Sequence, residues 1–471
     1  AGGWYLEAAE TLGADAAQPE EDVFELLSHL VAKSMVLVDK SSEVSPTAVR
    51  YRLLETIRQY AEEKLVEAGE ANLARARHRD WFLSFAEQAI EEMEGSDQKL
   101  WWDRLELELD NLRMALTWSA SDPGDSTHLL RLAGLLGRFW ALHGLAGEGT
   151  RWLEEALARS PTTATSDRAK ALDGLGALEL FNGHIERACS LLEESVAQAR
   201  IVGDRRVLTI ALQHLSSALR SMGNVERALQ LIQEATAISR EEGFASQLAW
   251  SLVNAAQCLA YAGQFESMEP LLLESVSAAR QSGAITSMLA STGALAQLYM
   301  MRADLSRARR TVDEAIALAG HLGMPLPTVS LLITRGDIAT AELDWHGADH
   351  WYQQALHTAT TAGARGIVAV ALRHYAALCV ALGEPGRAVR TLAATASIRK
   401  APLLIHIPIV EEEIIAAARR TLSDDEFAIA WAEGQSMTLE QVMTQIVGTL
   451  ESEVGSSAQD DEDAGARTQP D

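Results

Sequence analysis

The stretches "GHIERACSLLEESV" (183–196) and "GNVERALQLIQEAT" (223–236) repeat one phrase 40 residues apart, and this repetition decides the fold. Four further versions follow at the same interval: "GQFESM" at 263, "ADLSRA" at 303, "LDWHGA" at 343 and "GEPGRA" at 383. A second glycine series runs in step, at Gly203, Gly243, Gly283, Gly323 and Gly363. Between the glycines, apolar residues recur at helical spacing, and glycine readily ends a helix in the left-handed conformation. Each unit is therefore predicted to be helix, turn, helix, turn.

Within the unit, three positions are small and a fourth is bulky and apolar. The bulky series is Leu192, Ile232, Leu272, Val312, Tyr352 and Leu392. The small series are Gly176, Ser216, Ala256, Ala296, Gly336 and Ala376; then Ala188, Ala228, Met268 (the one exception), Ala308, Ala348 and Ala388; then Ser195, Ala235, Ser275, Ala315, Ala355 and Thr395. Small residues let paired helices approach closely. The pattern resembles tetratricopeptide repeats, lengthened from about 34 residues to about 40. We predict an all-α fold, a tetratricopeptide-like superhelical solenoid of helical-hairpin repeats, because an ordinary helical bundle needs no fixed period.

The remaining sequence follows other rules. Residues 20–34 and 55–69 read as helices, and the runs 35–39 and 49–54 between them read as a β-hairpin, the outline of a winged helix. Capping boxes at Ser423–Glu426 and Thr438–Gln441 predict helices near the other end. The predicted order is a winged-helix module (1–75), degenerate helical repeats (76–160), six tetratricopeptide-like repeats (161–400), C-terminal capping helices (401–450) and a disordered acidic tail (451–471).

Composition excludes several classes of protein. A net charge of −26 over 471 residues has the wrong sign for a chain that grips nucleic acid along a basic face. Three scattered cysteines make neither a disulfide framework nor a zinc site. Neither a signal peptide nor a membrane span is visible, so we expect a cytoplasmic protein. The first residue is Ala1 rather than methionine, so we expect a fragment of a longer chain.

Motifs outside the repeats resemble one family. "AGGWYLEAAE" (1–10), "LLSHLVAKSMVLVD" (26–39) and "RYRLLETIRQYAEEKL" (50–65) resemble the segment after the nucleotide-binding core of MalT-like STAND signal-transduction ATPases, in particular LuxR-type and NB-ARC-containing actinobacterial regulators. The likeness continues through "LELDNLRMALTW" (107–118) and "FAIAWAEGQSMTLEQ" (427–441). In that family an ATPase core precedes a winged helix and a repeat sensor. The resemblance implies that this chain is the regulatory part, joined to an upstream nucleotide-binding domain.

Two departures limit what the resemblance implies. No G-x-x-x-x-G-K-[ST] loop is present, so ATP or ADP and Mg²⁺ are expected only in an upstream domain, and no cofactor in this chain. Leu53, Leu54 and Glu55 stand where NB-ARC relatives carry a Met-His-Asp triplet, so nucleotide sensing is not expected here. No terminal helix-turn-helix and no catalytic motif is visible, and we expect neither an enzyme nor direct binding of nucleic acid.

Recognition is the remaining function. In the tetratricopeptide register, the first helix of each unit forms an inner wall, whose predicted partner-binding residues are Arg220, Trp250, Gln257, Tyr261, Gln297, Met301, Asp337 and Arg373. Aromatic and methionine side chains favour protein recognition, although residues such as Trp250 could equally fill the packing layer. Two hypotheses stay open: the sensor and protein-interaction region of a STAND-type transcriptional regulator, binding a protein, peptide or small-molecule effector, or a free-standing scaffold protein. A P-loop encoded upstream would favour the first.

Overall fold

The computed structural model describes residues 2–14, 20–39, 49–121, 126–320, 325–361, 365–395, 411–438 and 440–444. It divides into two compact units, which we describe separately. Unit 1 comprises residues 1–179, 185–251 and 277–288, and unit 2 comprises residues 180–184, 252–276 and 289–471. The predicted tail (451–471) and the expected glycine caps at Gly323 and Gly363 lie outside the described residues.

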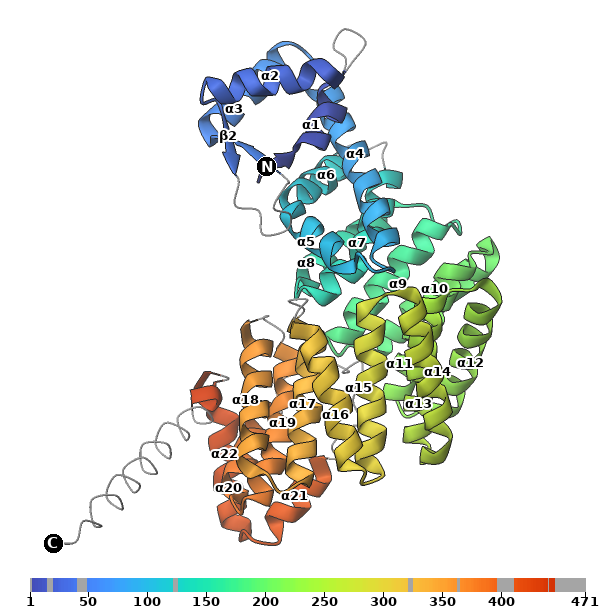
Figure 1. Cartoon of the computed structure of the whole chain (residues 1–471), viewed down its shortest axis with the longest axis vertical. Coiled ribbons are helices and arrows are strands. Elements are labelled where there is room, and N and C mark those ends of the chain that lie inside the picture. Colours follow the sequence, from blue (N-terminus) through green and yellow to red (C-terminus); the bar gives the residue numbers. More distant parts are fainter. Residues whose placement is uncertain are drawn as a thin grey trace, which may run out of the picture. The chain divides into compact units, whose positions relative to one another are not determined.

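Unit 1 begins with a small antiparallel sheet of strand order β1-β3-β2. The predicted hairpin is confirmed as β2 (Val36–Asp39) paired with β3 (Arg50–Leu53). The strand β1 (Trp4–Tyr5), paired with β3, was not predicted, because two residues show no alternation. The helices beside the sheet are α1 (Leu6–Gly13), α2 (Glu20–Ala32) and α3 (Glu55–Glu67) (Figure 1).

A buried ion pair fastens this sheet to the helices that follow. Arg50 Nη1 lies 2.5 Å from Glu108 Oε1, and the two side chains are 10% and 2% exposed. Arg50 Nη2 donates to the carbonyl oxygens of Gly3 (3.2 Å) and Leu107 (2.7 Å). Asn111 Nδ2 donates to Glu108 Oε2 at 2.5 Å and to the Gly3 carbonyl at 2.8 Å. The charges are thus paired and hydrogen-bonded, as burial requires.

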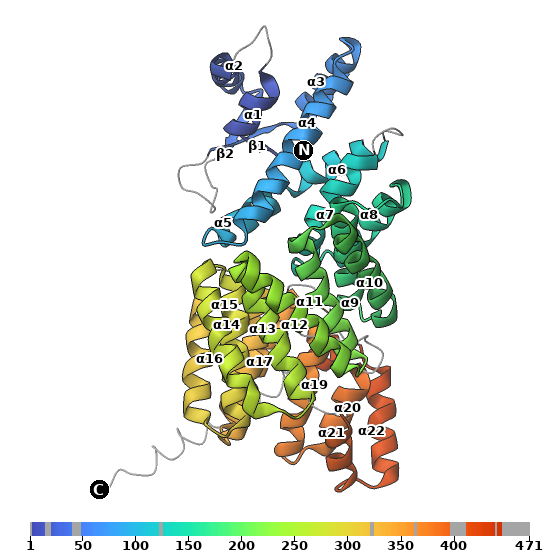
Figure 2. The same ribbon diagram turned by 90° about the vertical axis from the view of Figure 1, so that its right-hand side faces the viewer.

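A helical region follows without a break. Its helices are α4 (Ala71–Glu92), α5 (Gln98–Leu107), α6 (Leu109–Ser121), α7 (Ser126–Leu142) and α8 (Ala146–Arg159). Figure 2 shows α4 as one long helix that ends at the turn before α5. The boundary predicted at residue 75 falls inside α4.

The repeats are antiparallel helix pairs, as the 40-residue period predicts. Their first helices are α9 (Ser166–Phe181), α11 (Arg205–Ser221), α13 (Ala245–Tyr261), α15 (Ile285–Met301), α17 (Pro325–Ala341) and α19 (Arg365–Ala381). Their second helices are α10 (Ile185–Val202), α12 (Val225–Glu242), α14 (Met268–Ser282, after the 3-10 turn Phe265–Ser267), α16 (Leu305–Gly320), α18 (Trp345–Thr361) and α20 (Pro385–Thr395). The all-α, tetratricopeptide-like fold is therefore confirmed.

The predicted left-handed caps are present where the structure describes them. Gly183, Gly203, Gly223, Gly243, Gly263, Gly283 and Gly383 all have φ between 70° and 80°. Two positions of the series carry side chains instead, and both still adopt the left-handed conformation: Ala303 (φ 59°) and Leu343 (φ 62°). The turn geometry of the repeat is therefore kept even where the sequence lacks glycine.

The bulky series forms the centre of each helix pair. Leu192, Ile232, Leu272, Val312, Tyr352 and Leu392 are all buried. A Cβ at Gly176 would lie 2.6 Å from Leu192 Cγ, and one at Gly336 would lie 2.6 Å from Tyr352 Cε1. Glycine at these two positions is required by the close approach of the paired helices.

Beyond the repeats, unit 2 contains α21 (Glu411–Arg419) and α22 (Asp424–Ser436). Both capping boxes are confirmed: Glu426 N donates to Ser423 Oγ while Ser423 N donates to Glu426 Oε2, and Thr438 and Gln441 make the equivalent pair. Val389, Ala418, Phe427 and Ala430 form a buried cluster there. In the described part of the chain, no helix is both long and apolar enough to cross a membrane.

Candidate functional site

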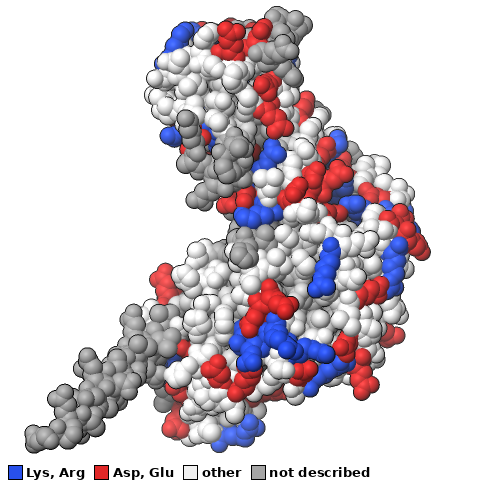
Figure 3. Space-filling view, in the orientation of Figure 1, with Lys and Arg blue, Asp and Glu red and all other residues white. Residues whose placement is uncertain are grey.

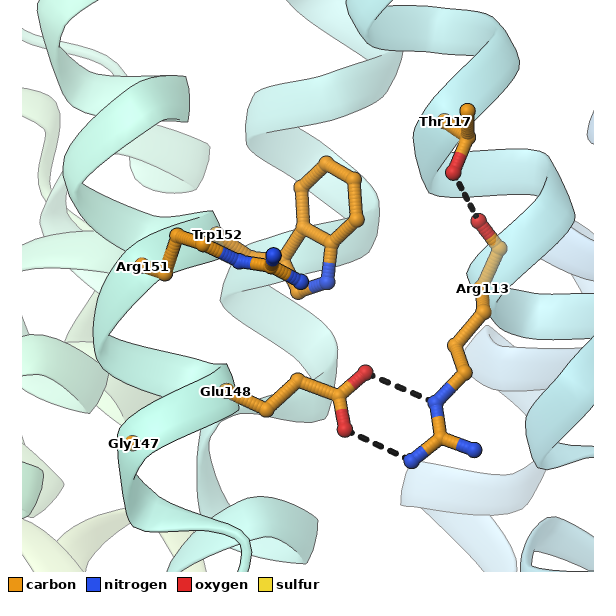
Figure 4. Close-up of a pocket in the computed structure, with 6 residues that line it drawn as sticks. All are labelled: Arg113, Thr117, Gly147, Glu148, Arg151 and Trp152. Atoms are coloured by element: carbon orange, nitrogen blue, oxygen red, sulfur yellow. Dashed lines mark hydrogen bonds and ion pairs between the residues drawn. The ribbon is translucent and has the colours of Figure 1, made fainter.

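A polar pocket of about 610 Å³ lies between α6 and α8 in unit 1. Its lining residues are Arg113, Thr117, Gly147, Glu148, Arg151 and Trp152 (Figure 4). Gly147 and Glu148 belong to the first turn of α8, and Arg113 reaches across from α6. The pocket is thus bounded by side chains from two helices of the degenerate repeat region.

A two-bond ion pair spans the pocket. Arg113 Nε and Nη2 donate to the two carboxylate oxygens of Glu148, at 2.8 and 2.7 Å (Figure 4). These hydrogen bonds lower the pKa of Glu148 and raise that of Arg113. Asp110 Oδ1 accepts a further bond from Arg113 at 3.1 Å. The main charges of the pocket therefore satisfy each other.

The other wall of the pocket is aromatic and cationic. The Arg151 guanidinium carbon lies 5.0 Å from the centre of the Trp152 ring. Trp152 is buried. The Thr117 hydroxyl donates to the Arg113 carbonyl at 2.8 Å. Among the described residues, no group of three or more His, Cys, Asp or Glu side chains could hold a metal ion. The ring, the guanidinium groups and the carboxylate could contact a bound molecule.

The sequence-predicted residues of unit 1 lie on first helices of the repeats. Arg220 is buried and donates to Ser217 Oγ at 3.2 Å, and Trp250 is partly buried. Neighbouring polar groups join successive helices: Gln213 Nε2 donates to the Gln247 carbonyl (2.8 Å) and to Ser251 Oγ (2.9 Å). Polar residues at this face therefore link repeat to repeat.

The predicted residues of unit 2 divide into buried and accessible ones. Gln257 and Gln297 are buried, and Gln297 Nε2 donates to Thr334 Oγ1 of the next first helix at 3.2 Å. Tyr261 is 43% exposed, and Met301 is partly buried. Of this set, only Tyr261 offers a large side chain to solvent.

The two charged residues predicted in unit 2 are both paired. Asp337 Oδ1 accepts a bond from Tyr352 Oη at 2.7 Å and lies 2.8 Å from His374 Nδ1. Arg373 Nη1 lies 3.2 Å from Glu411 Oε1. Their charges therefore already have partners within the unit.

Sequence reasoning missed one set of contacts in unit 1, made by the turn between α4 and α5 (residues 93–98, the α4–α5 corner). Glu94 accepts from the Arg206 guanidinium and, at 2.6 Å, from Gln247 Nε2. Gln98 Oε1 accepts from Thr286 N at 2.9 Å, while Gln98 Nε2 donates to Thr286 Oγ1 at 3.0 Å. No motif signals contacts between residues so far apart.

Charge on the visible surface is mixed. On the face in Figure 3, Lys and Arg side chains are interspersed with Asp and Glu. Arg200 with Glu234 and Arg205 with Glu242 are typical exposed pairs between repeats, at 2.7 and 2.8 Å. In the lower half of that face, a group of Lys and Arg side chains lies beside acidic ones.

Comparison with known proteins gives a partial likeness. No protein-family model matches the chain. The chain is 34% identical over 219 residues to "Putative HTH-type transcriptional regulator Rv0890c" of Mycobacterium tuberculosis (strain ATCC 25618 / H37Rv), and equally so to a counterpart in Mycobacterium bovis. The match covers 45% of this chain and 24% of the length of those relatives. The similarity is thus to one part of much longer regulators.

Solved structures give distant likenesses. A STAND protein with a tetratricopeptide repeat sensor from Pyrococcus horikoshii has a TM-score of 0.45 and 14% identity, covering 83% of this chain and 59% of that one. A Rap protein complexed with competence and sporulation factor has a TM-score of 0.44 and 12% identity, covering 70% and 98%.

Proposed function

We propose that this chain is the sensor and protein-interaction region of a transcriptional regulator of the MalT-like STAND type. The observation that carries the proposal is the 34% identity, over 219 residues, to HTH-type regulators of mycobacteria. The repeated helix pairs support it, since such arrays present extended binding surfaces rather than catalytic clefts. The small sheet with α1 to α3 would be the winged-helix module, and an upstream domain would hold ATP.

The pairing of charges supports binding rather than chemistry. Arg113 with Glu148, Arg373 with Glu411 and Asp337 with His374 are all satisfied within their units. A general acid or base must reach the proton that it transfers from within a cleft, whereas we propose that these pairs hold neighbouring helices together. Tyr261, exposed on a first helix, is the predicted partner-binding residue best placed to reach another molecule.

Transcript profiling in the source organism tests the proposal. One strain lacks the whole gene, and the other carries the gene without the codons for residues 161–400. We expect both strains to change the same set of transcripts, in the same or in opposite directions. Unchanged transcripts in both strains would contradict a regulator and favour the scaffold alternative.

The isolated chain is expected to bind neither ATP nor DNA, because it lacks a phosphate loop and carries a net charge of −26. Titration calorimetry with ATP and Mg²⁺, and gel shifts with genomic DNA fragments, measure this directly. Saturable ATP binding at micromolar concentration would reveal a nucleotide site within these residues.

A further inference from the structure

The α4–α5 corner touches the first residues of three repeat helices, and all of these residues lie in unit 1. Its partners Arg206, Gln247 and Thr286 are the second, third and second residues of α11, α13 and α15. The amides of a helix's first turn lack partners within the helix, and the helix dipole makes that end attractive to negative charge. Glu94 therefore places a carboxylate beside the first turns of α11 and α13, where a helix favours negative charge.

The corner combines buried anchors with Glu94, whose carboxylate is partly exposed. Met93 and Gln98 are buried, and Gln98 has its amide bonded to Thr286 on both sides. Glu94 differs from them, because its side chain is 16% exposed and its partner Arg206 is 47% exposed. The Glu94 side chain can therefore leave its partners while the anchors hold the corner in place.

The surface around Glu94 has more positive charge than Glu94 neutralises. Arg138 of α7 is partly buried, and its Nη2 lies 3.5 Å from Thr286 Oγ1. No carboxylate of the described residues forms an ion pair with it, although the Glu94 charge acts on it through space. Burial lowers the pKa of the Arg138 guanidinium, which reflects the cost of an unpaired cation there. Two guanidinium groups thus share one carboxylate.

We propose that Arg206, Gln247 and Arg138 form a binding surface for an acidic peptide segment of a partner protein, and that Glu94 occupies this surface as an internal competitor. A partner carboxylate would take over the two donors that Glu94 now uses, the Arg206 guanidinium and the Gln247 amide. This deepens the proposed function, since it names the chemistry of the partner. Its test needs only the isolated chain, so it can fail while the regulatory role stands.

Competition by a tethered group follows from effective concentration. A side chain held beside its site is present at millimolar effective concentration or above, and weakens an external ligand accordingly. Removal of the Glu94 carboxylate should therefore strengthen binding of an acidic peptide. If the contact is only structural, removal should lower stability and leave binding unchanged.

The experiment measures fluorescence anisotropy of a fluorescein-labelled hexaglutamate peptide, with hexaglutamine as the uncharged control, at low and physiological salt. The variants are Glu94→Ala and its matched control Glu92→Ala, an exposed glutamate two residues earlier, at the end of α4. Glu94→Gln, which keeps the shape of the side chain, replaces Glu94→Ala if thermal melting shows that the latter is unfolded.

We expect Glu94→Ala to bind hexaglutamate about tenfold more tightly than the wild type or Glu92→Ala. Adding Arg206→Ala to Glu94→Ala should abolish that gain, and hexaglutamine should bind none of the variants. Equal affinity of the Glu94 and Glu92 variants, or a gain that survives Arg206→Ala, would overturn the proposal.

Discussion

Polar contacts within the repeats and those of the α4–α5 corner differ in how far along the chain they reach. Gln213 with Ser251, Gln297 with Thr334 and Asp337 with His374 join residues 37 or 38 positions apart, about one repeat. The corner joins residues 112, 153 and 188 positions apart. The contacts within the repeats recur about once per repeat. The contacts of the α4–α5 corner instead join several repeats to a segment outside them.

The difference concerns cooperativity. A repeat array behaves as a sum of local units and nearest-neighbour interfaces, so damage in one repeat is felt mainly nearby. Long-range contacts such as Arg50 with Glu108, 58 positions apart, do not follow the 40-residue period. Substitutions should therefore lower the free energy of unfolding most at a buried contact that occurs once. At equivalent positions of different repeats, they should lower it by similar amounts.

The largest effect is expected at the unique buried pair. Glu108→Ala leaves Arg50 buried without its carboxylate and should lower the free energy of unfolding by about 3–5 kcal/mol. Urea denaturation followed by circular dichroism measures this. Glu106→Ala, at an exposed glutamate two residues earlier in α5, should cost less than about 0.5 kcal/mol. A loss below about 1 kcal/mol for Glu108→Ala would mean that the pair does not matter more than a surface pair.

Equivalent core positions should cost similar amounts. Leu192→Ala in unit 1 and Leu272→Ala in unit 2 each remove a fully buried leucine from the centre of a helix pair. Each should lower the free energy of unfolding by about 3 kcal/mol, as for other buried leucines. The same urea experiment applies to both. If the two losses in free energy of unfolding differ by much more than about 1 kcal/mol, the two helix pairs are not equivalent.

Two substitutions should stabilise the repeats. Leu343, which is 68% exposed, and Ala303 both adopt the left-handed conformation that a side chain disfavours. Leu343→Gly and Ala303→Gly remove this strain, which should raise the free energy of unfolding by about 0.5–1 kcal/mol. The greater flexibility of glycine in the unfolded chain offsets part of that gain. Gly223→Ala, at the same point of another repeat, should lower it by about 1 kcal/mol. Destabilisation by both glycine substitutions would contradict the argument.

The smallest effect is expected at the pocket between α6 and α8, and it depends on pH. Hydrogen bonds from Arg113 hold the pKa of Glu148 in the folded protein below its value in the unfolded chain. The pair therefore stabilises the folded protein at pH values above the ordinary glutamate pKa. That stability is lost as the pH falls through the lowered folded pKa. Glu148→Gln should cost less than about 1 kcal/mol at pH 7, because Arg113 is partly exposed. Unfolding curves at pH 7 and pH 3 should show the difference shrinking, and an undiminished difference would refute this origin.

Much of the fold could be predicted because the information is local and repeated. The bulky positions from Leu192 to Leu392 and the glycine caps recur at a fixed interval, so each confirms the others. The capping boxes at Ser423 and Thr438 are likewise short-range patterns, and both formed as predicted.

The candidate site was less predictable. Carrying the tetratricopeptide register onto the chain identified helix faces, but exposure there depends on the neighbouring helix. Gln297 is buried because Thr334 of the next helix covers it, whereas Tyr261, at the end of α13, stays accessible. The sequence shows which way a side chain points on its own helix and not what packs against it.

The sequence by itself determined the helical repeat, its caps and its core, since helix periodicity and left-handed turns are set by residues a few positions apart. Only the tertiary structure decided that Glu94 meets Arg206 and Gln247, that Gln98 caps Thr286, and that Arg50 is buried against Glu108. Such contacts depend on where the chain returns in space. The sequence contains many charged residues, and nothing in it marks which two distant ones will form a pair.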